Sequence, residues 1–425
     1  MANNFDSNFT NKLARVFLDQ FESKRVLSKN VDTQLLAGKF DASTGDTVYF
    51  KRPTDYVSVR TAAGDLTSST ASSIITGKAS GVVQNYFTVF VDYDEADEAI
   101  KMDQLDQLLD PMSTRIVTDF EVDFASYMMK NAALLAGTVG TAADTWNDIA
   151  EAGAIMQASG VPMDAKWCYA VNPFTQRALA STNRSLGAGG VAGSVIKNSL
   201  DRATIDENFA GMKVMTATTL ASYTTGTGAD RSGTVVGTPT ATYVGAKDTM
   251  TQSIAVTAFQ ANLVVAAGET VSIATRYRLN LSTRTVMLDD TGAPVPWSGT
   301  VTASVTLGAS GEGTLVVSGP AIYEASGQYN TTASAIAASD VITLGGAAAT
   351  TIQPNLFWHK QAFSVGSVPI KKLQSIDTVA TTADGLQFRI SKGSDFIKNQ
   401  QKVRIDFRPA YGTMNPFFAG HGFGT

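Results

Sequence analysis

The sequence predicts an α+β protein in which an all-β domain interrupts a mixed host domain. Residues 47–220 alternate strand patterns with long helix-forming stretches. Residues 221–346 are rich in Thr, Gly, Ala, Ser and Val, which indicates short strands and turns. A denser mixed sequence resumes at residue 355. A chain that changes character and then returns to it is typical of a domain inserted into another.

Length, composition and net charge limit the number of domains and the kinds of partner that the chain can have. The 425 residues are enough for two or three domains. Charged residues make up 17%, below the usual quarter or so. This deficit indicates either surface buried against other subunits or a β-rich domain that uses Thr and Ser as its polar residues. The net charge of −5 argues against a chain that binds polyanions over its whole surface.

The first segment predicts an amphipathic helix. One apolar stripe recurs at a spacing of four residues, at Phe5, Phe9, Leu13, Phe17 and Phe21. This stripe must be buried, either on its own domain or on a neighbouring subunit. Residues 45–81 then predict a hairpin with a long polar tip, with Val48–Phe50 and Tyr56–Arg60 as its strands.

A strand at 83–93 precedes a long helix. Asp110 and Pro111 form an N-cap and first-turn pair, and the helix runs to about residue 136. Its length of roughly 38 Å suits the backbone of a domain. Its apolar residues again lie four apart, at Met112, Ile116, Phe120, Phe124 and Met128.

The same region, residues 92–123, is strongly acidic. Three interpretations are open: a solvated helix face, a calcium-binding loop, or a face that lines a space holding nucleic acid and repels its phosphates. The calcium loop lacks the glycine needed at its sixth position, where Asp97 stands. The acidic residues are Asp92, Asp94, Glu95, Asp97, Glu98, Asp103, Asp106, Asp110, Asp119, Glu121 and Asp123.

No sequence feature indicates an enzyme. Cys168 is the single cysteine and lies in an apolar run, and the only histidines are His359 and His421. No phosphate-binding loop or G-x-S-x-G motif is present, and the glycines at 187–193 follow a helix instead of a strand. We expect no catalytic site, no cofactor, no metal and no membrane segment.

The later segments predict strands. Val301, Ala303, Val305 and Leu307 alternate with Thr and Ser, which favours an antiparallel barrel or sandwich. Lys402–Arg408 alternates in the same way and is mildly basic.

Three motifs carry a resemblance to a known family. They are Asn355–Phe363 (NLFWHKQAF), Trp167–Pro173 (WCYAVNP) and Asn208–Val214 (NFAGMKV). With these motifs, and with the order amphipathic arm, extended loop, long helix, central domain, β insertion and return, the chain resembles the major coat proteins of short-tailed lambdoid bacteriophages over nearly its whole length. The resemblance implies the Hong Kong 97-like capsid fold with axial and peripheral domains, a long spine helix and an inserted antiparallel β-barrel.

The resemblance also implies a domain map. The expected parts are an N-terminal helical arm at 1–45, an extended loop at 46–82, a peripheral domain at 83–136 with the spine helix at 111–136, an axial domain at 137–220 and 347–400, the inserted β-barrel at 221–346, and a C-terminal strand and tail at 401–425.

The implied function is a structural major capsid protein. It would assemble in the host bacterial cytoplasm, as pentamers and hexamers and with a scaffolding protein, into an icosahedral procapsid that expands. The shell would carry a portal protein and enclose double-stranded DNA without sequence-specific binding. The alternative is a glycan-binding protein that uses the inserted domain. The expected subunit contacts are Phe5, Phe9, Leu13, Phe17, Phe21, Val48, Phe50, Val57 and Val59.

Overall fold

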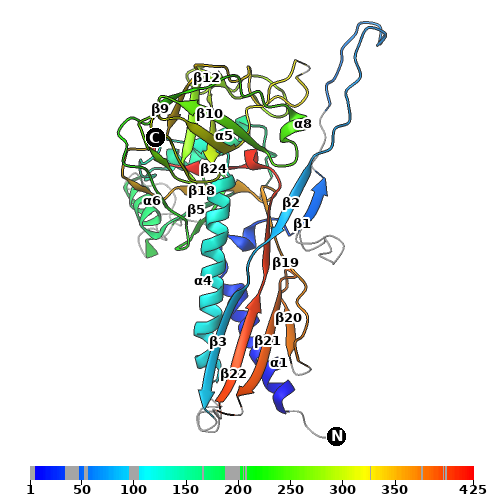
Figure 1. Cartoon of the computed structure of the whole chain (residues 1–425), viewed down its shortest axis with the longest axis vertical. Coiled ribbons are helices and arrows are strands. Elements are labelled where there is room, and N and C mark those ends of the chain that lie inside the picture. Colours follow the sequence, from blue (N-terminus) through cyan, green and yellow to red (C-terminus); the bar gives the residue numbers. More distant parts are fainter. Residues whose placement is uncertain are drawn as a thin grey trace. The chain divides into compact units, whose positions relative to one another are not determined.

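The structure, a computed structural model, forms two compact units. Unit 1 comprises Met1–Tyr49, Ser80–Ala125 and Phe363–Gly412, and unit 2 comprises Phe50–Ala79, Ser126–Ala362 and Thr413–Thr425. The predicted α+β class is confirmed (Figure 1). The residues described are 5–33, 47–51, 56–94, 105–164, 167–186, 202–203, 205, 208–325, 327–374, 377–395, 397 and 400–425.

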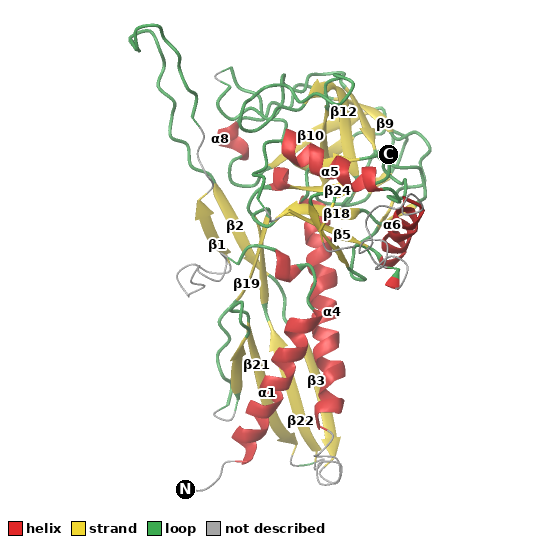
Figure 2. Ribbon diagram, turned by 180° about the vertical axis from the view of Figure 1, so that it is seen from behind, coloured by secondary structure: helices red, strands yellow, loops and turns green. Residues whose placement is uncertain are grey.

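Unit 1 is built on an antiparallel sheet with two helices on one face (Figure 2). The strands follow the order β20 (Thr378–Thr381), β21 (Gln387–Asp395), β22 (Gln400–Phe407) and β3 (Phe87–Asp94). The helices are α1 (Phe5–Lys24) and α4 (Leu105–Asn131), and a short 3₁₀ turn, η1 (Ser28–Asn30), follows α1. A second sheet has the order β1 (Thr47–Lys51), β2 (Lys78–Val83), β23 (Pro409–Thr413) and β19 (Phe363–Ser367).

Aromatic rings form the core of unit 1. Phe21 lies 4.5 Å from the Phe388 ring and 5.8 Å from the Phe407 ring, measured between centroids. Phe120 of α4 lies 5.1 Å from Phe407. Edge-on contacts of this kind add to the gain from burial. The alternation of Val403, Ile405 and Phe407 toward this core and the four-residue spacing of the α4 stripe are both confirmed by burial.

Unit 2 contains a six-stranded sheet and a closed barrel. The sheet order is β4 (Leu134–Ala136), β24 (Ala419–Gly422), β18 (Asn355–His359), β5 (Trp167–Val171), β7 (Met212–Thr216) and β6 (Asn208–Phe209). Its accompanying helices are α5 (Trp146–Ala158) and α6 (Pro173–Leu186), and η4 (Pro416–Phe418) precedes β24. Thr145 and Asp148 form a capping box at the start of α5.

The barrel is antiparallel, as predicted. Its strands close in the order β10 (Thr251–Thr257), β15 (Gly313–Ser318), β13 (Pro296–Val301), β12 (Thr270–Tyr277), β16 (Val341–Leu344) and β9 (Ser232–Val235). Buried residues such as Ile254, Trp297 and Leu315 fill it. Two short pairs, β11 (Val264–Val265) with β14 (Val305–Thr306) and β8 (Tyr223–Thr224) with β17 (Thr351–Ile352), and the short helix α8 (Tyr243–Ala246) complete the unit.

The predicted long helix has different ends in the structure. It runs over Leu105–Asn131 instead of 111–136, so Pro111 lies inside it and not at its first position. The helix ends early because the amide of Ala133 donates to the carbonyl oxygens of Pro416 and Ala419, 3.1 and 3.0 Å away. These bonds direct the chain into β4.

The domain expectation for residues 363–425 is also wrong in part. Residues 363–400 do not join 137–220, because β20 and β21 pair with β22 and β3 in unit 1. Residues 401–425 are not one terminal element either. β22 belongs to unit 1, whereas β24 lies between β4 and β18 in unit 2.

The aromatic core of unit 1 yields a stability prediction. We expect Phe21→Ala to lower the free energy of unfolding of unit 1 by about 3–5 kcal/mol, because it leaves a cavity among packed rings. Hydrogen exchange of the β21 and β22 amides measures this loss without requiring both units to unfold together.

Phe90→Ala on β3 is the control, since that ring is 69% exposed, and its effect should stay within about 0.5 kcal/mol. Equal losses in the two variants would contradict the packing of Phe21 within its own chain.

Candidate functional site: assembly surfaces

The segment between β1 and β2 is the most exposed part of the described chain. Residues 56–77 form a long loop with no regular secondary structure (Figure 1). The expected strand at Tyr56–Arg60 is therefore wrong, because these residues have no strand to pair with. Large apolar side chains nevertheless line the loop, and those exposed to solvent are Tyr56, Val57, Val59, Leu66 and Ile74.

The two arms of this loop run together. The Val57 amide donates to Ser72 Oγ at 3.1 Å. At the tip, the Ser69 amide donates to the Leu66 carbonyl at 2.9 Å and the Thr67 amide to Asp65 Oδ1 at 2.9 Å. Local hydrogen bonds thus shape the tip, while its apolar side chains stay in solvent. Large apolar side chains exposed along one projecting segment indicate an interaction surface.

The expected contact residues fall into three groups. Val57 and Val59 are 50% and 47% exposed, and Val48 is buried in β1. Phe17 and Phe21 are buried against their own chain, so we do not retain them as subunit contacts. The side chains of Phe5, Phe9, Leu13 and Phe50 lie outside the described residues.

A buried carboxylate accepts hydrogen bonds from the segment that follows α1. Glu121 of α4 is 1% exposed. Its carboxylate accepts the amides of Leu27 at 2.7 Å and Ser28 at 3.1 Å, and the Ser28 hydroxyl also donates to it. The interpretation of the acidic run as a solvated face is therefore wrong for Glu121. This position connects the N-terminal helix to the long helix within unit 1.

The Glu121 carboxylate makes unit 1 sensitive to pH. Burial raises its pKa above the ordinary 4.5. Between 4.5 and the raised value, the native state holds a proton that the unfolded state has lost. The free energy of unfolding therefore falls as pH rises through that window and levels off above it.

We expect Glu121→Gln to flatten this pH dependence, since the amide does not titrate. Urea unfolding of unit 1 at a series of pH values measures it. Asp119→Asn, which removes an exposed carboxylate from the same helix, is the matched control. Parallel stability curves for the native chain and Glu121→Gln would count against the role of Glu121.

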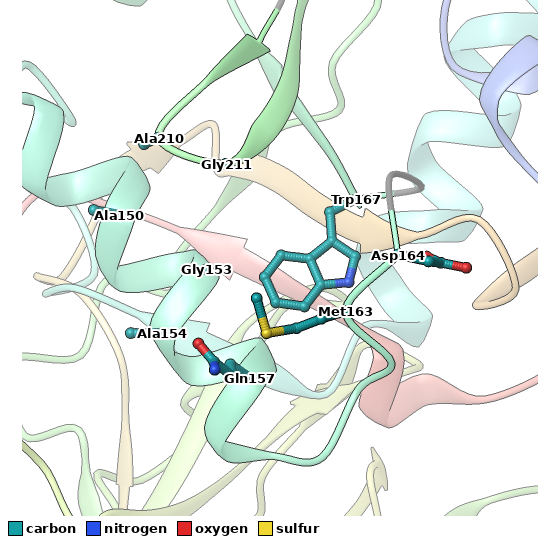
Figure 3. Close-up of a pocket in the computed structure, with 9 residues that line it drawn as sticks. All are labelled: Ala150, Gly153, Ala154, Gln157, Met163, Asp164, Trp167, Ala210 and Gly211. Atoms are coloured by element: carbon teal, nitrogen blue, oxygen red, sulfur yellow. The ribbon is translucent and has the colours of Figure 1, made fainter.

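A hollow of about 430 Å³ lies beside α5 in unit 2. The small residues Ala150, Gly153 and Ala154 form one side, and Figure 3 shows Met163 and the Trp167 indole beside them. Two of its polar side chains, Trp167 and Asp164, have partners in the same chain. The Trp167 indole N–H donates to the Pro162 carbonyl at 2.8 Å, and Asp164 at the rim lies 2.8 Å from His359 Nε2.

Cys168 and His421 are both buried and unsuited to covalent catalysis. Burial raises the pKa of the Cys168 thiol to about 11, which keeps it protonated. Burial lowers the pKa of His421 to about 4, and its Nε2 lies 2.8 Å from the Met129 carbonyl. Within the described ranges, no group of three metal-binding side chains occurs, and no helix has the length and apolarity to cross a membrane.

Comparison with known proteins identifies the family. The family model "P22 coat protein - gene protein 5" matches residues 1–424. The chain belongs to the P22 coat protein family. A curated relative, the "Major capsid protein" of Acyrthosiphon pisum secondary endosymbiont phage 1, is 34% identical over 427 residues and is covered, like this chain, over 100% of its length.

Two solved phage structures are similar in shape. A chain from Mycobacterium phage Che8 has a TM-score of 0.48 and 12% identity, covering 94% of this chain and 90% of that one. A chain from the "Capsid structure of the Cyanophage P-SCSP1u" has a TM-score of 0.43 and 11% identity, covering 93% and 86%.

The family match confirms the predicted resemblance to phage coat proteins. This member of the P22 coat protein family is a shell-forming structural protein of a phage virion and not an enzyme.

Proposed function

We propose that this coat protein assembles in the host cytoplasm, with a scaffolding protein, into an icosahedral procapsid of pentamers and hexamers. The procapsid expands, carries a portal protein and encloses double-stranded DNA. The exposed apolar loop at residues 56–77 supports this proposal, because a coat-family subunit that leaves such residues in solvent needs a second copy to cover them.

The contact energy per subunit need not be large. Each subunit meets several neighbours, and linked weak contacts become a stable assembly. In this proposal, Val57 and Val59 contribute apolar contact area, and Val48 and Phe50 belong to the strand from which the loop extends. In this proposal, the acidic run between 92 and 123, apart from the buried Glu121, repels phosphate and so keeps packaged DNA from adhering.

The described aromatic residues of the insert do not form the exposed cluster that glycan binding needs, and Tyr323, at 40% exposure, is the single exposed one among them. Sugar recognition by the insert would need accessible aromatic faces. Trp297 is buried in the barrel, and Tyr243 and Tyr329 stack on each other with centroids 3.8 Å apart and are both buried.

Electron microscopy of the protein expressed with its neighbouring phage genes, alongside sedimentation of the protein alone, tests the proposal. Closed icosahedral shells in the co-expressed sample are the expected result. A discrete small oligomer in both samples would overturn it, and glycan binding by residues 221–346 would then be tested.

The loop contact yields a mutational prediction. We expect the double variant Val57→Asp with Val59→Asp to weaken each loop contact at least about tenfold, which corresponds to about 1.4 kcal/mol, and so to reduce shell yield. The reason is that each change places a charge in an apolar contact. Sedimentation measures the yield, and near-ultraviolet circular dichroism verifies the fold of the free subunit.

Ser58→Asp is the matched control, since it adds a charge between the two valines without removing an apolar side chain. Normal shell yield in the double variant would remove these valines from the contact.

A further inference from the structure

The root of the extended loop, residues 73–78, is held by the inserted domain of the same chain. The Lys78 amide donates to Asp248 Oδ1 at 2.9 Å. Gln328 Nε2 donates to the Ser73 carbonyl at 3.1 Å, and the Tyr329 hydroxyl reaches the Ile75 carbonyl at 3.4 Å. Three side chains from the insert thus bind the backbone at three positions of the root, residues 73, 75 and 78.

Packing reinforces these hydrogen bonds. Ile75 packs against a buried cluster that includes Tyr243, Ala246 and Tyr329. A Cβ added at Gly77 would lie 2.5 Å from the backbone carbonyl oxygen of Lys247, closer than atoms can approach. The loop root therefore fits closely against the end of α8.

The receiving surface is itself rigid. The Tyr243 amide at the start of α8 donates to Glu324 Oε1 at 3.2 Å. The Glu324 amide donates to Asn330 Oδ1 at 2.7 Å, and Asn330 Nδ2 returns a bond to the Glu324 carbonyl at 3.0 Å. A reciprocal pair of this kind fixes the turn that carries Gln328 and Tyr329.

The charge on Asp248 also favours the bond to the loop. The Lys78 amide, together with Lys247, holds the pKa of the Asp248 carboxyl below its ordinary value. Asp248 therefore remains an ionised acceptor, and such acceptors bind amides more strongly than neutral ones do.

We propose that the inserted domain carries the positioning residues of the extended loop. Asp248, Gln328 and Tyr329 hold residues 73–78 and so set the direction in which residues 56–72 leave the subunit. This role deepens the proposed function, on which it rests, because it assigns the insert to the same contact. Fixing the loop before contact lowers the entropy lost when a neighbour binds it.

A distance measurement in the free subunit tests the proposal directly. Ala63→Cys near the loop tip and Ala309→Cys on the barrel provide two exposed labelling positions, while the native Cys168 is buried. Double electron–electron resonance between spin labels at these positions should show one narrow distance peak. We expect Asp248→Ala combined with Gln328→Ala to abolish the narrow peak.

Asp289→Ala is the matched control. Asp289 is also an exposed aspartate of the insert, but it accepts the amides of its own turn, Thr291 and Ala293, at 2.9 and 2.8 Å. Its removal should leave the narrow peak in place. Loss of the peak in this control would show a general effect on the insert and would overturn the proposal.

Gly77→Ala tests the same contact from the loop side and leaves the barrel residues unchanged, so it remains informative if the double variant does not fold. It too should abolish the narrow peak. A narrow peak retained in Gly77→Ala, or in a folded double variant, would overturn the proposal.

Measuring the shell yield of the same variants distinguishes the positioning role of the insert from the loop contact of the proposed function. A broadened distance distribution with reduced shell yield supports both the positioning role and the loop contact. A broadened distribution with normal yield supports the positioning role and contradicts the loop contact of the proposed function.

Discussion

One constraint governs the assembly surface, which is that the segment at residues 56–72 has no core of its own. Its apolar side chains, Val57 and Leu66 among them, stay in solvent, and its backbone has no strand partner. An isolated segment of this kind gains its burial only from another molecule. For a member of the P22 coat protein family, the same segment on many copies makes that partner a neighbouring subunit.

The structure combines this exposed loop with rigid supports. In unit 1, the rings of Phe21, Phe388 and Phe407 pack together, and buried Glu121 fixes the segment after α1. In unit 2, the insert leaves and re-enters the host through the paired strands β8 and β17, so its two ends meet without disturbing the six-stranded sheet. Buried Arg278 donates to the carbonyls of Ala133 and Ser298, both at 2.6 Å, and so joins barrel and host.

Local periodicity allowed much of the fold to be predicted. The stripe from Met112 to Met128 and the alternation from Val403 to Phe407 both depend on neighbours within a few residues. The strand partners of residues 363–400 could not be predicted, because pairing joins distant segments and periodicity does not encode the partner. The predicted start of the long helix was wrong because it was placed at Pro111. Proline is favoured in the first turn of a helix but does not have to mark it.

The candidate surface was only partly accessible to the same reasoning. The run of small polar residues predicted the loop. The contacts that hold the root of the loop depend on single polar side chains. Asp248 lies 170 residues from Lys78, and Gln328 lies 255 residues from Ser73. Neither stands in a recognisable motif. In the sequence, Glu121 cannot be distinguished from the other residues of the acidic run. Its burial and its hydrogen bonds from the Leu27 and Ser28 amides become visible only in the structure.

Cryo-electron microscopy of shells assembled from the native chain would show directly where residues 56–72 lie. We expect them to lie on a neighbouring subunit, with Val57 and Val59 buried between the two copies. A closed shell in which this loop remains surrounded by solvent would contradict it.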